Sequence, residues 1–147
     1  MKFLMLIMMN VLLLVGCSLH NNDKVDEIIE KISVVPIDVN EPDTVEAVAK
    51  NEKRSLSIKH EVKGHDVYIE CYVPNFHFSK ENVGKRNKDG EGHIHLYLNG
   101  EKITKIYKAA FIVKGLPSGK HKLKIEIAHN NHTPYDKLYE ELEVKIP

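Results

Sequence analysis

From Ser55 onward, apolar and polar residues alternate along the chain with a period of two. Successive side chains of a β-strand point to opposite faces of the sheet, so this alternation predicts strands with one buried face. The runs are 56–62, 67–73, 94–98, 102–107, 109–113, 123–127 and 138–146. The pair Asn99-Gly100 closes the third run and is a strong hairpin signal. About seven short strands separated by turn signals predict an all-β fold, an antiparallel Ig-like β-sandwich.

The chain between Ser18 and Arg54 has a different pattern. It is polar and charged, with Pro36 and Pro42 as breakers of regular structure. Residues 24–32 place apolar side chains at helical spacing, but this stretch is too short to be a stable isolated helix. We therefore expect a tether that carries a short helix at most.

The first residues have the pattern of a secretory signal. A charged start is followed by an apolar run, Phe3 to Val15, and then by Gly16-Cys17. That run is shorter than the roughly 20 residues with which a helix crosses a bilayer. The ending Leu14-Val15-Gly16-Cys17 resembles the lipobox of bacterial lipoproteins. The resemblance implies that Cys17 becomes the first residue of the mature chain and carries a diacylglyceryl group, with palmitate as an acyl chain. The alternatives are an ordinary signal peptide with an incidental cysteine, or an uncleaved anchor.

Three segments follow from these patterns. We expect a signal peptide at 1–16, the lipidated Cys17 and tether at 17–54, and the β-sandwich domain at 55–147. The expected location is the extracytoplasmic side of the cell membrane, with the lipid as the membrane contact. Two acyl chains are sufficient for stable anchoring, whereas one would be marginal.

Charge and sulfur content exclude several classes of function. The chain has 21 basic and 21 acidic side chains, so it has no electrostatic footprint for nucleic acid. After removal of the signal, Cys71 is the only thiol besides Cys17, and no intramolecular disulfide is expected. Cys71 alternates in phase with the apolar residues of its strand, so its side chain should point into the core. This position favours a role as a small buried hydrophobic residue over a role as a ligand or nucleophile.

Histidine is the residue type that suggests chemistry. The chain has nine histidines, and the densest group lies in Gly90-Glu91-Gly92-His93-Ile94-His95. His93 and His95 share one face of a strand, and the glycines leave room beside the first ring. A second group is His129-Asn130-Asn131-His132, where Asn-Asn favours a turn. His121 follows the Gly119 turn. Histidines at strand ends also commonly pack without binding anything, and this alternative stays open.

The stretch from Gly90 to Tyr135 resembles an uncharacterised His-rich domain of secreted bacterial proteins. Its motifs are Gly-x-Gly-His-x-His-Leu, here residues 90–96, then Leu-Pro-x-Gly-x-His-x-Leu, here residues 116–123, and a terminal Asn-x-x-His-x-Pro or similar. The last corresponds here to Asn130-Asn131-His132-Thr133-Pro134, which has one residue fewer between the asparagine and the histidine. Family members often have three consecutive histidines where this chain has His93-Ile94-His95. The resemblance implies that His93, His95, His121 and His132 belong together. The function of that family is not established.

These observations lead to one leading hypothesis and one alternative. We expect His93, His95 and His132 to bind Zn(II) or Cu(II), with His129 or His121 completing the ligand set. Imidazole binds metal only when neutral, so the affinity should fall as the pH drops through about 6.5. The protein would then be a lipid-anchored binding protein for a metal ion or small ligand. The alternative is an interaction or structural module of the envelope, without a metal and with a protein partner that the sequence does not identify.

Catalytic signatures are missing from the sequence. It contains no Gly-x-Ser-x-Gly, no phosphate-binding loop and no His-Glu-x-x-His. We therefore do not expect an enzyme.

Overall fold

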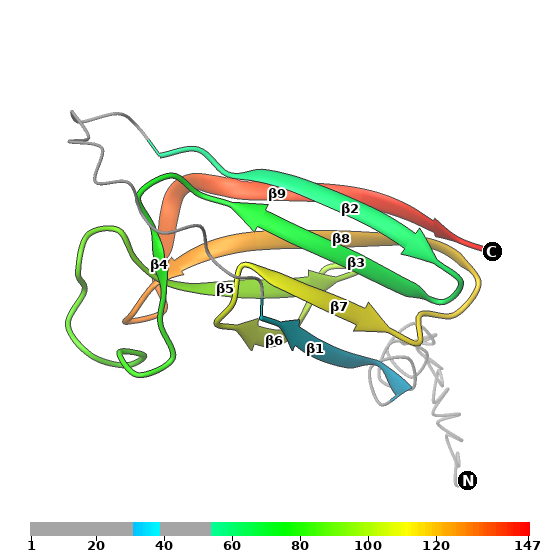
Figure 1. Cartoon of the computed structure of the whole chain (residues 1–147), viewed down its shortest axis with the longest axis horizontal. Helices are drawn as coiled ribbons and strands as arrows, with labels where there is room; N and C mark the ends of the chain where they lie inside the picture. Colours follow the sequence, from blue (N-terminus) through cyan, green and yellow to red (C-terminus); the bar gives the residue numbers. More distant parts are fainter. Residues whose placement is uncertain (1–30, 39–53) are drawn as a thin grey trace, which may run out of the picture.

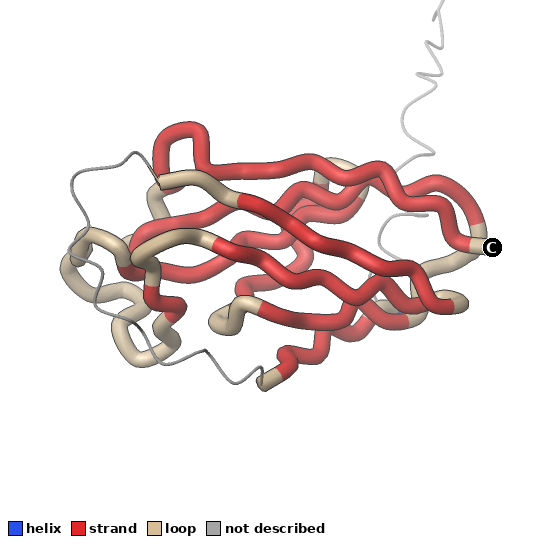
Figure 2. The backbone as a smooth tube through the Cα atoms, turned by 45° about the horizontal axis from the view of Figure 1, so that its top comes forward, coloured by secondary structure: helices blue, strands red, loops and turns tan. Residues whose placement is uncertain are grey.

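The strands form two facing sheets. The computed structural model describes residues 31–38 and 54–147, and the strands run lengthwise through this domain (Figure 1). One sheet has the order β1-β7-β3-β2, and the other has the order β4-β5-β8-β9 with β6 also paired to β5. Their bounds are β1 Ser33–Ile37, β2 Ser57–Lys63, β3 Asp66–Tyr72, β4 His77–Phe78, β5 Glu91–Leu98, β6 Glu101–Ile106, β7 Ala110–Lys114, β8 Gly119–His129 and β9 Pro134–Ile146. Strand pairing is antiparallel except between β4 and β5. The predicted antiparallel Ig-like β-sandwich is confirmed, and strands make up most of the tube in Figure 2.

The hydrophobic core lies between the two sheets and follows the parity read from the sequence. Ile94, Leu96 and Leu98 of β5 point into it, as do Leu123, Ile125 and Ile127 of β8. Phe111 on the opposite sheet is fully buried among them. Removing this apolar surface from water is the main favourable contribution to folding. Cys71 belongs to the same core, and burial raises the pKa of its thiol to about 12. Its predicted role as a buried hydrophobe is confirmed.

Two strands depart from the sequence-based expectation. Ser33–Ile37 lies in the segment expected to be a tether, yet it forms β1 and pairs with β7 from Ser33↔Lys114 to Ile37↔Ala110. Proline is compatible with an edge strand, where one side of the backbone has no ladder partner, so Pro36 does not prevent this pairing. The other strand, β4, has only two residues and is too short to give a periodic signal. The sandwich therefore includes residues before Ser55.

Several expectations concern residues outside the described part of the chain. These are the signal at 1–16, Cys17 and most of the short helix expected at 24–32. Among residues 31–38 and 54–147, no helix has the length and apolar character needed to cross a membrane.

Candidate metal centre

His93 and His95 lie on the outer face of the five-stranded sheet. Ile94 and Leu96 of the same strand point into the core, so the two histidines point the other way, as strand parity requires. Across the sheet they are paired with Ala128 and Glu126 of β8. Their side chains are nevertheless buried, with 0% and 3% exposure.

His132 reaches this face through a tight turn after β8. Its backbone N–H donates to the carbonyl of His129 at 2.9 Å, and the N–H of His129 donates to the carbonyl of Thr133 at 2.8 Å. The turn places His132 in the left-handed region, with φ of 71°. Asn131 supports it, since its side-chain oxygen accepts from the Thr133 backbone N–H and hydroxyl group. The chain thus folds back and brings the His132 ring to within 4.9 Å of the His93 ring, centroid to centroid.

Three ring nitrogens converge at this point. His93 Nε2 lies 3.0 Å from His95 Nε2 and 3.0 Å from His132 Nδ1. The ligand atoms of the three histidines all lie within 4.8 Å of one another. A ring nitrogen carries either one proton or one lone pair, so at most one of the two contacts at His93 Nε2 can be a well-directed hydrogen bond. The other ring nitrogen of His93, Nδ1, is buried and has no hydrogen-bond partner in the described part of the chain.

Burial keeps these histidines neutral. Burial, followed by the neighbouring His95 and His132, lowers the pKa of His93 to about 4. Burial also lowers the pKa of His95 to about 4, with Lys102 acting in the same direction and Glu126 in the opposite one. The pKa of His132 is lowered by partial burial and then by Lys105 and Lys102. The three imidazoles are therefore in the form that binds metal at pH 7. The pH at which protons begin to compete with a metal should therefore be well below about 6.5, the value expected from the sequence.

Glu126 lies behind His95. Its Oε1 is 3.6 Å from His95 Nδ1, and it accepts a hydrogen bond from the Tyr97 hydroxyl group at 3.0 Å. Although burial acts to raise the pKa of Glu126, hydrogen bonds from Lys124 and Tyr97 hold it below its usual value. A carboxylate beside Nδ1 favours the tautomer that carries its proton there, which leaves the Nε2 lone pair free for the cluster.

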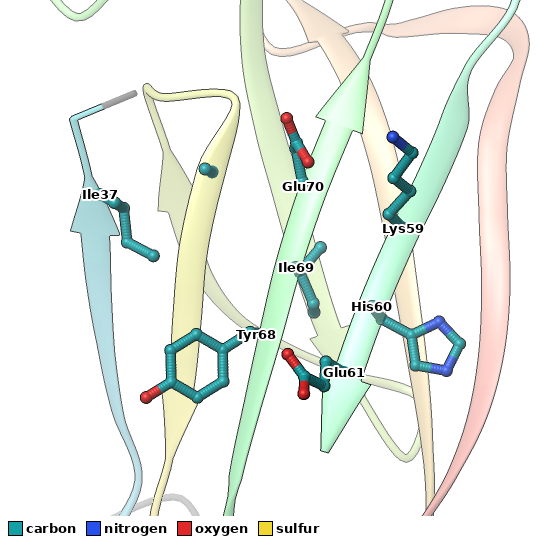
Figure 3. A pocket seen from close by; sticks show the side chains of 8 residues that line it. Ile37, Lys59, His60, Glu61, Tyr68, Ile69 and Glu70 are labelled. Carbon is teal, nitrogen blue, oxygen red and sulfur yellow. The ribbon is translucent and has the colours of Figure 1, made fainter. Parts of the chain in front are cut away.

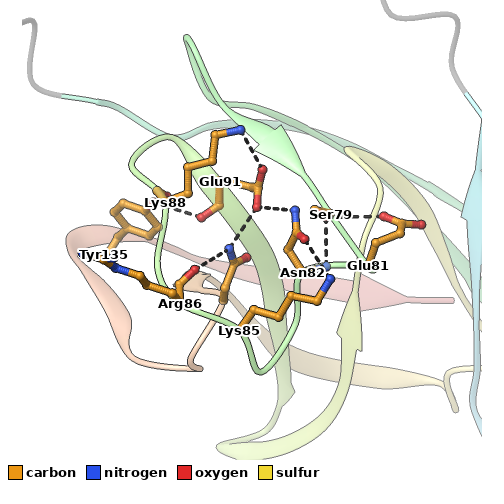
Figure 4. A network of polar contacts seen from close by, with 9 residues as sticks. Ser79, Glu81, Asn82, Lys85, Arg86, Lys88, Glu91 and Tyr135 are labelled. Atoms are coloured by element: carbon orange, nitrogen blue, oxygen red, sulfur yellow. Dashed lines mark hydrogen bonds and ion pairs between the residues drawn. The ribbon is translucent and has the colours of Figure 1, made fainter.

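A buried polar network fixes the two segments that supply the histidines (Figure 4). The Glu91 carboxylate, 4% exposed as a residue, accepts hydrogen bonds from Asn82 Nδ2 at 2.7 Å and from Asn130 Nδ2 at 2.9 Å. The Tyr135 hydroxyl group donates to the Glu91 carbonyl at 3.0 Å. Glu91 precedes His93 by two residues and Asn130 precedes His132 by two, so this network ties the start of β5 to the turn. No role for Glu91 or Asn130 was predicted from the sequence, although both lie within the motifs that contain the histidines.

The other two predicted ligands lie elsewhere. His129 stacks on Tyr135, with ring centroids 3.5 Å apart, and is not part of the cluster. His121 sits near the opposite end of β8, where Nε2 lies 2.8 Å from the Pro117 carbonyl oxygen. His121 therefore serves as a hydrogen-bond partner for a carbonyl group of the turn before β8. The structure therefore brings together His93, His95 and His132, and it brings neither His121 nor His129 to them.

A hollow on the outer face of the four-stranded sheet does not resemble a metal site. It is lined mainly by Lys59, Glu61, Tyr68 and Glu70, together with His60 (Figure 3). His60 has the parity of the apolar residues of its strand, but β2 is at the edge of the sheet and His60 is exposed. An exposed position at an edge strand makes His60 a suitable control for substitutions at the buried cluster.

Comparisons with known proteins give distant structural similarities and no match in sequence. No protein-family model matches the chain, and no curated protein sequence matches it. Among solved structures, the PKD1 domain of the Vibrio cholerae metalloprotease PrtV aligns with a TM-score of 0.40 and 9% identity, over 63% of this chain and 95% of that one. The fibronectin(III)-like modules of Clostridium thermocellum CbhA align with a TM-score of 0.38 and 10% identity, over 61% and 96%.

Proposed function

We propose that this protein binds one divalent transition-metal ion, Zn(II) or Cu(II), through His93 Nε2, His95 Nε2 and His132 Nδ1. The convergence of these three nitrogens supports the proposal most strongly, since His93 Nε2 is 3.0 Å from each of the others. Imidazole nitrogens in a tetrahedral zinc site lie about 2.0–2.1 Å from the ion, and therefore about 3.4 Å from one another. Small movements of the rings would open the cluster to that geometry.

The character of the donors favours these two ions. All three donors are imidazoles, which suit Zn(II) and Cu(II), whereas Cu(I) prefers thioether or thiolate sulfur. The Glu126 carboxylate faces His95 Nδ1, whereas His95 Nε2 is the nitrogen that lies in the cluster. Three protein ligands leave a tetrahedral ion with one open position. The function we propose is to buffer, sense or hand over the ion, without catalysis.

Substitution of the ligands tests this function directly. We expect His95→Ala and the double variant His93→Ala/His95→Ala to lower Zn(II) affinity more than about 100-fold, because the loss of a ligand costs more than the loss of an outer partner. Isothermal titration calorimetry and metal analysis after dialysis would measure the change. His60→Ala is the control and should bind as the wild type does. Equal affinity in the wild type and the double variant would favour the interaction or structural module, in which the histidines serve packing.

We further propose that the protein works on the extracytoplasmic side of the cell membrane, anchored by lipid on Cys17. The support is the lipobox-like Leu14-Val15-Gly16-Cys17 after the short apolar run. Cys17→Ser removes the sulfur that would carry the lipid, so the protein should appear in the soluble fraction or remain an unprocessed precursor. Cell fractionation and labelling with a fatty-acid analogue would show this. Normal processing and membrane attachment of Cys17→Ser would contradict the anchor.

A further inference from the structure

Two lysines of β6 stand beside the three-histidine cluster. In the β5–β6 ladder, Lys105 pairs with His95 and Lys102 pairs with Tyr97. Directly paired residues of neighbouring strands share a face of the sheet, so both lysines lie on the histidine face. Together with Ile103, Thr104 and Tyr107 they line a shallow hollow. The ring of Tyr107, one of the lining residues, lies 5.8 Å from the His93 ring, so the hollow is next to the cluster.

Neither lysine is neutralised. Within residues 31–38 and 54–147, the ammonium groups of Lys102 and Lys105 form no ion pair, and both residues are exposed. The nearby carboxylate of Glu126 is already paired, since Lys124 Nζ lies 2.6 Å from it. Because Lys105 is paired with His95, and Lys102 with Tyr97 two residues further along β5, both positive charges lie on the face that carries the cluster.

This arrangement is unfavourable for a cation alone. A divalent ion held by neutral imidazoles on the same face as two ammonium groups would be repelled by them. An anion bound at the open coordination position removes that repulsion and gives both lysines a partner. We propose that the metal-loaded cluster binds an oxyanion of the phosphate type, with one oxygen on the metal and others on Lys102 and Lys105. This inference rests on the proposed metal site.

The phosphate class fits the number and kind of donors. The metal ion and the two ammonium groups are three separate positive charges. A tetrahedral oxyanion with two negative charges has enough oxygen atoms to contact all three. Lysine binds phosphate as a point charge and does not need a planar partner. A singly charged carboxylate would neutralise less of the charge and leave one of these groups without an oxygen.

Cobalt substitution provides the experiment. The d–d absorption of Co(II) bound to the full chain in chloride-free buffer would be followed during titration with inorganic phosphate. We expect a saturable change, with affinity for phosphate about tenfold or more lower in Lys102→Gln/Lys105→Gln. In the absence of phosphate, that variant should bind Co(II) more tightly than the wild type. The control Lys59→Gln/Lys114→Gln removes the same charge from the four-stranded sheet and should change neither quantity.

The outcomes separate the two proposals. Binding of Co(II) with no spectral response to phosphate, or with equal phosphate affinity in both lysine variants, would overturn the oxyanion site and leave the metal site standing. Failure of the wild type to bind Co(II), Zn(II) and Cu(II) would overturn both. Parallel titrations with phosphoethanolamine and acetate test which chemical class of anion the site prefers and whether a phosphate ester or free phosphate is the source. Tighter binding of phosphoethanolamine than of phosphate would indicate an esterified headgroup as the source, in support of the site, and tighter binding of acetate would contradict the phosphate class.

Discussion

Gly92→Ala should lower the free energy of unfolding by about 3 kcal/mol or more. A Cβ built on Gly92 would lie 2.0 Å from the carbonyl oxygen of Ala128 and 3.2 Å from the ring of Phe76. The first clash is with backbone, and that backbone belongs to β8, which is held to β5 by the pairing of His93 with Ala128. A side-chain rotation cannot relieve it, so the two strands must separate locally. Urea denaturation followed by circular dichroism would measure the loss.

Gly64→Ala is the matched control for this variant. Gly64 has φ of 58°, where a side chain is strained, but a Cβ there would have no atom within 4 Å. Its cost should stay near the roughly 1–2 kcal/mol of left-handed strain. If Gly92→Ala lowered the free energy of unfolding no more than Gly64→Ala does, β5 and β8 would not lie as close together at Gly92 as described. Because His93 follows Gly92 directly, we also expect Gly92→Ala to weaken metal binding.

The metal-free domain should lose stability as the pH falls from about 6.5 to about 4.5. His93 and His95 have a pKa of about 4 in the folded chain, against about 6.5 in the unfolded chain. Between these values the unfolded state binds more protons, so the free energy of unfolding decreases as the pH falls. We expect a total loss of about 3 kcal/mol, allowing for relaxation around the coupled pair. Urea unfolding at a series of pH values would measure it.

The window above pH 4.5 isolates the histidines from the carboxylates. The pKa values of Glu91 and Glu126 are lowered, so their contributions are lost only below the usual carboxylate range. In His93→Gln/His95→Gln the stability should therefore change much less over this window. An unchanged slope in that variant would assign the titration to other groups. Saturating Zn(II) should hold the wild type stable to lower pH, since the ion binds the folded state and competes with protons.

The alternation of apolar and polar residues was sufficient to predict most of the strands and the face on which their residues lie. Alternation is a local property of an extended backbone, so it was enough to predict β2, β3 and β5–β9, to place Cys71 in the core and to put His93 and His95 on one side of their strand. It failed where the signal was weak. Pro36 obscured β1, and β4 has too few residues to show a period.

The pairing and packing of distant segments bring the residues of the site together. Strand pairing places Glu126 and Lys105 on either side of His95, and a turn in the left-handed region returns His132 to His93. His121 belongs to a motif of the same family resemblance as the cluster histidines, but it lies near the other end of β8. Strand register and the path of a turn depend on contacts between segments far apart in the chain. Such contacts produce no periodic pattern in the sequence that could be used to predict them. Strand parity was therefore readable from the sequence, whereas the composition of the site required the fold.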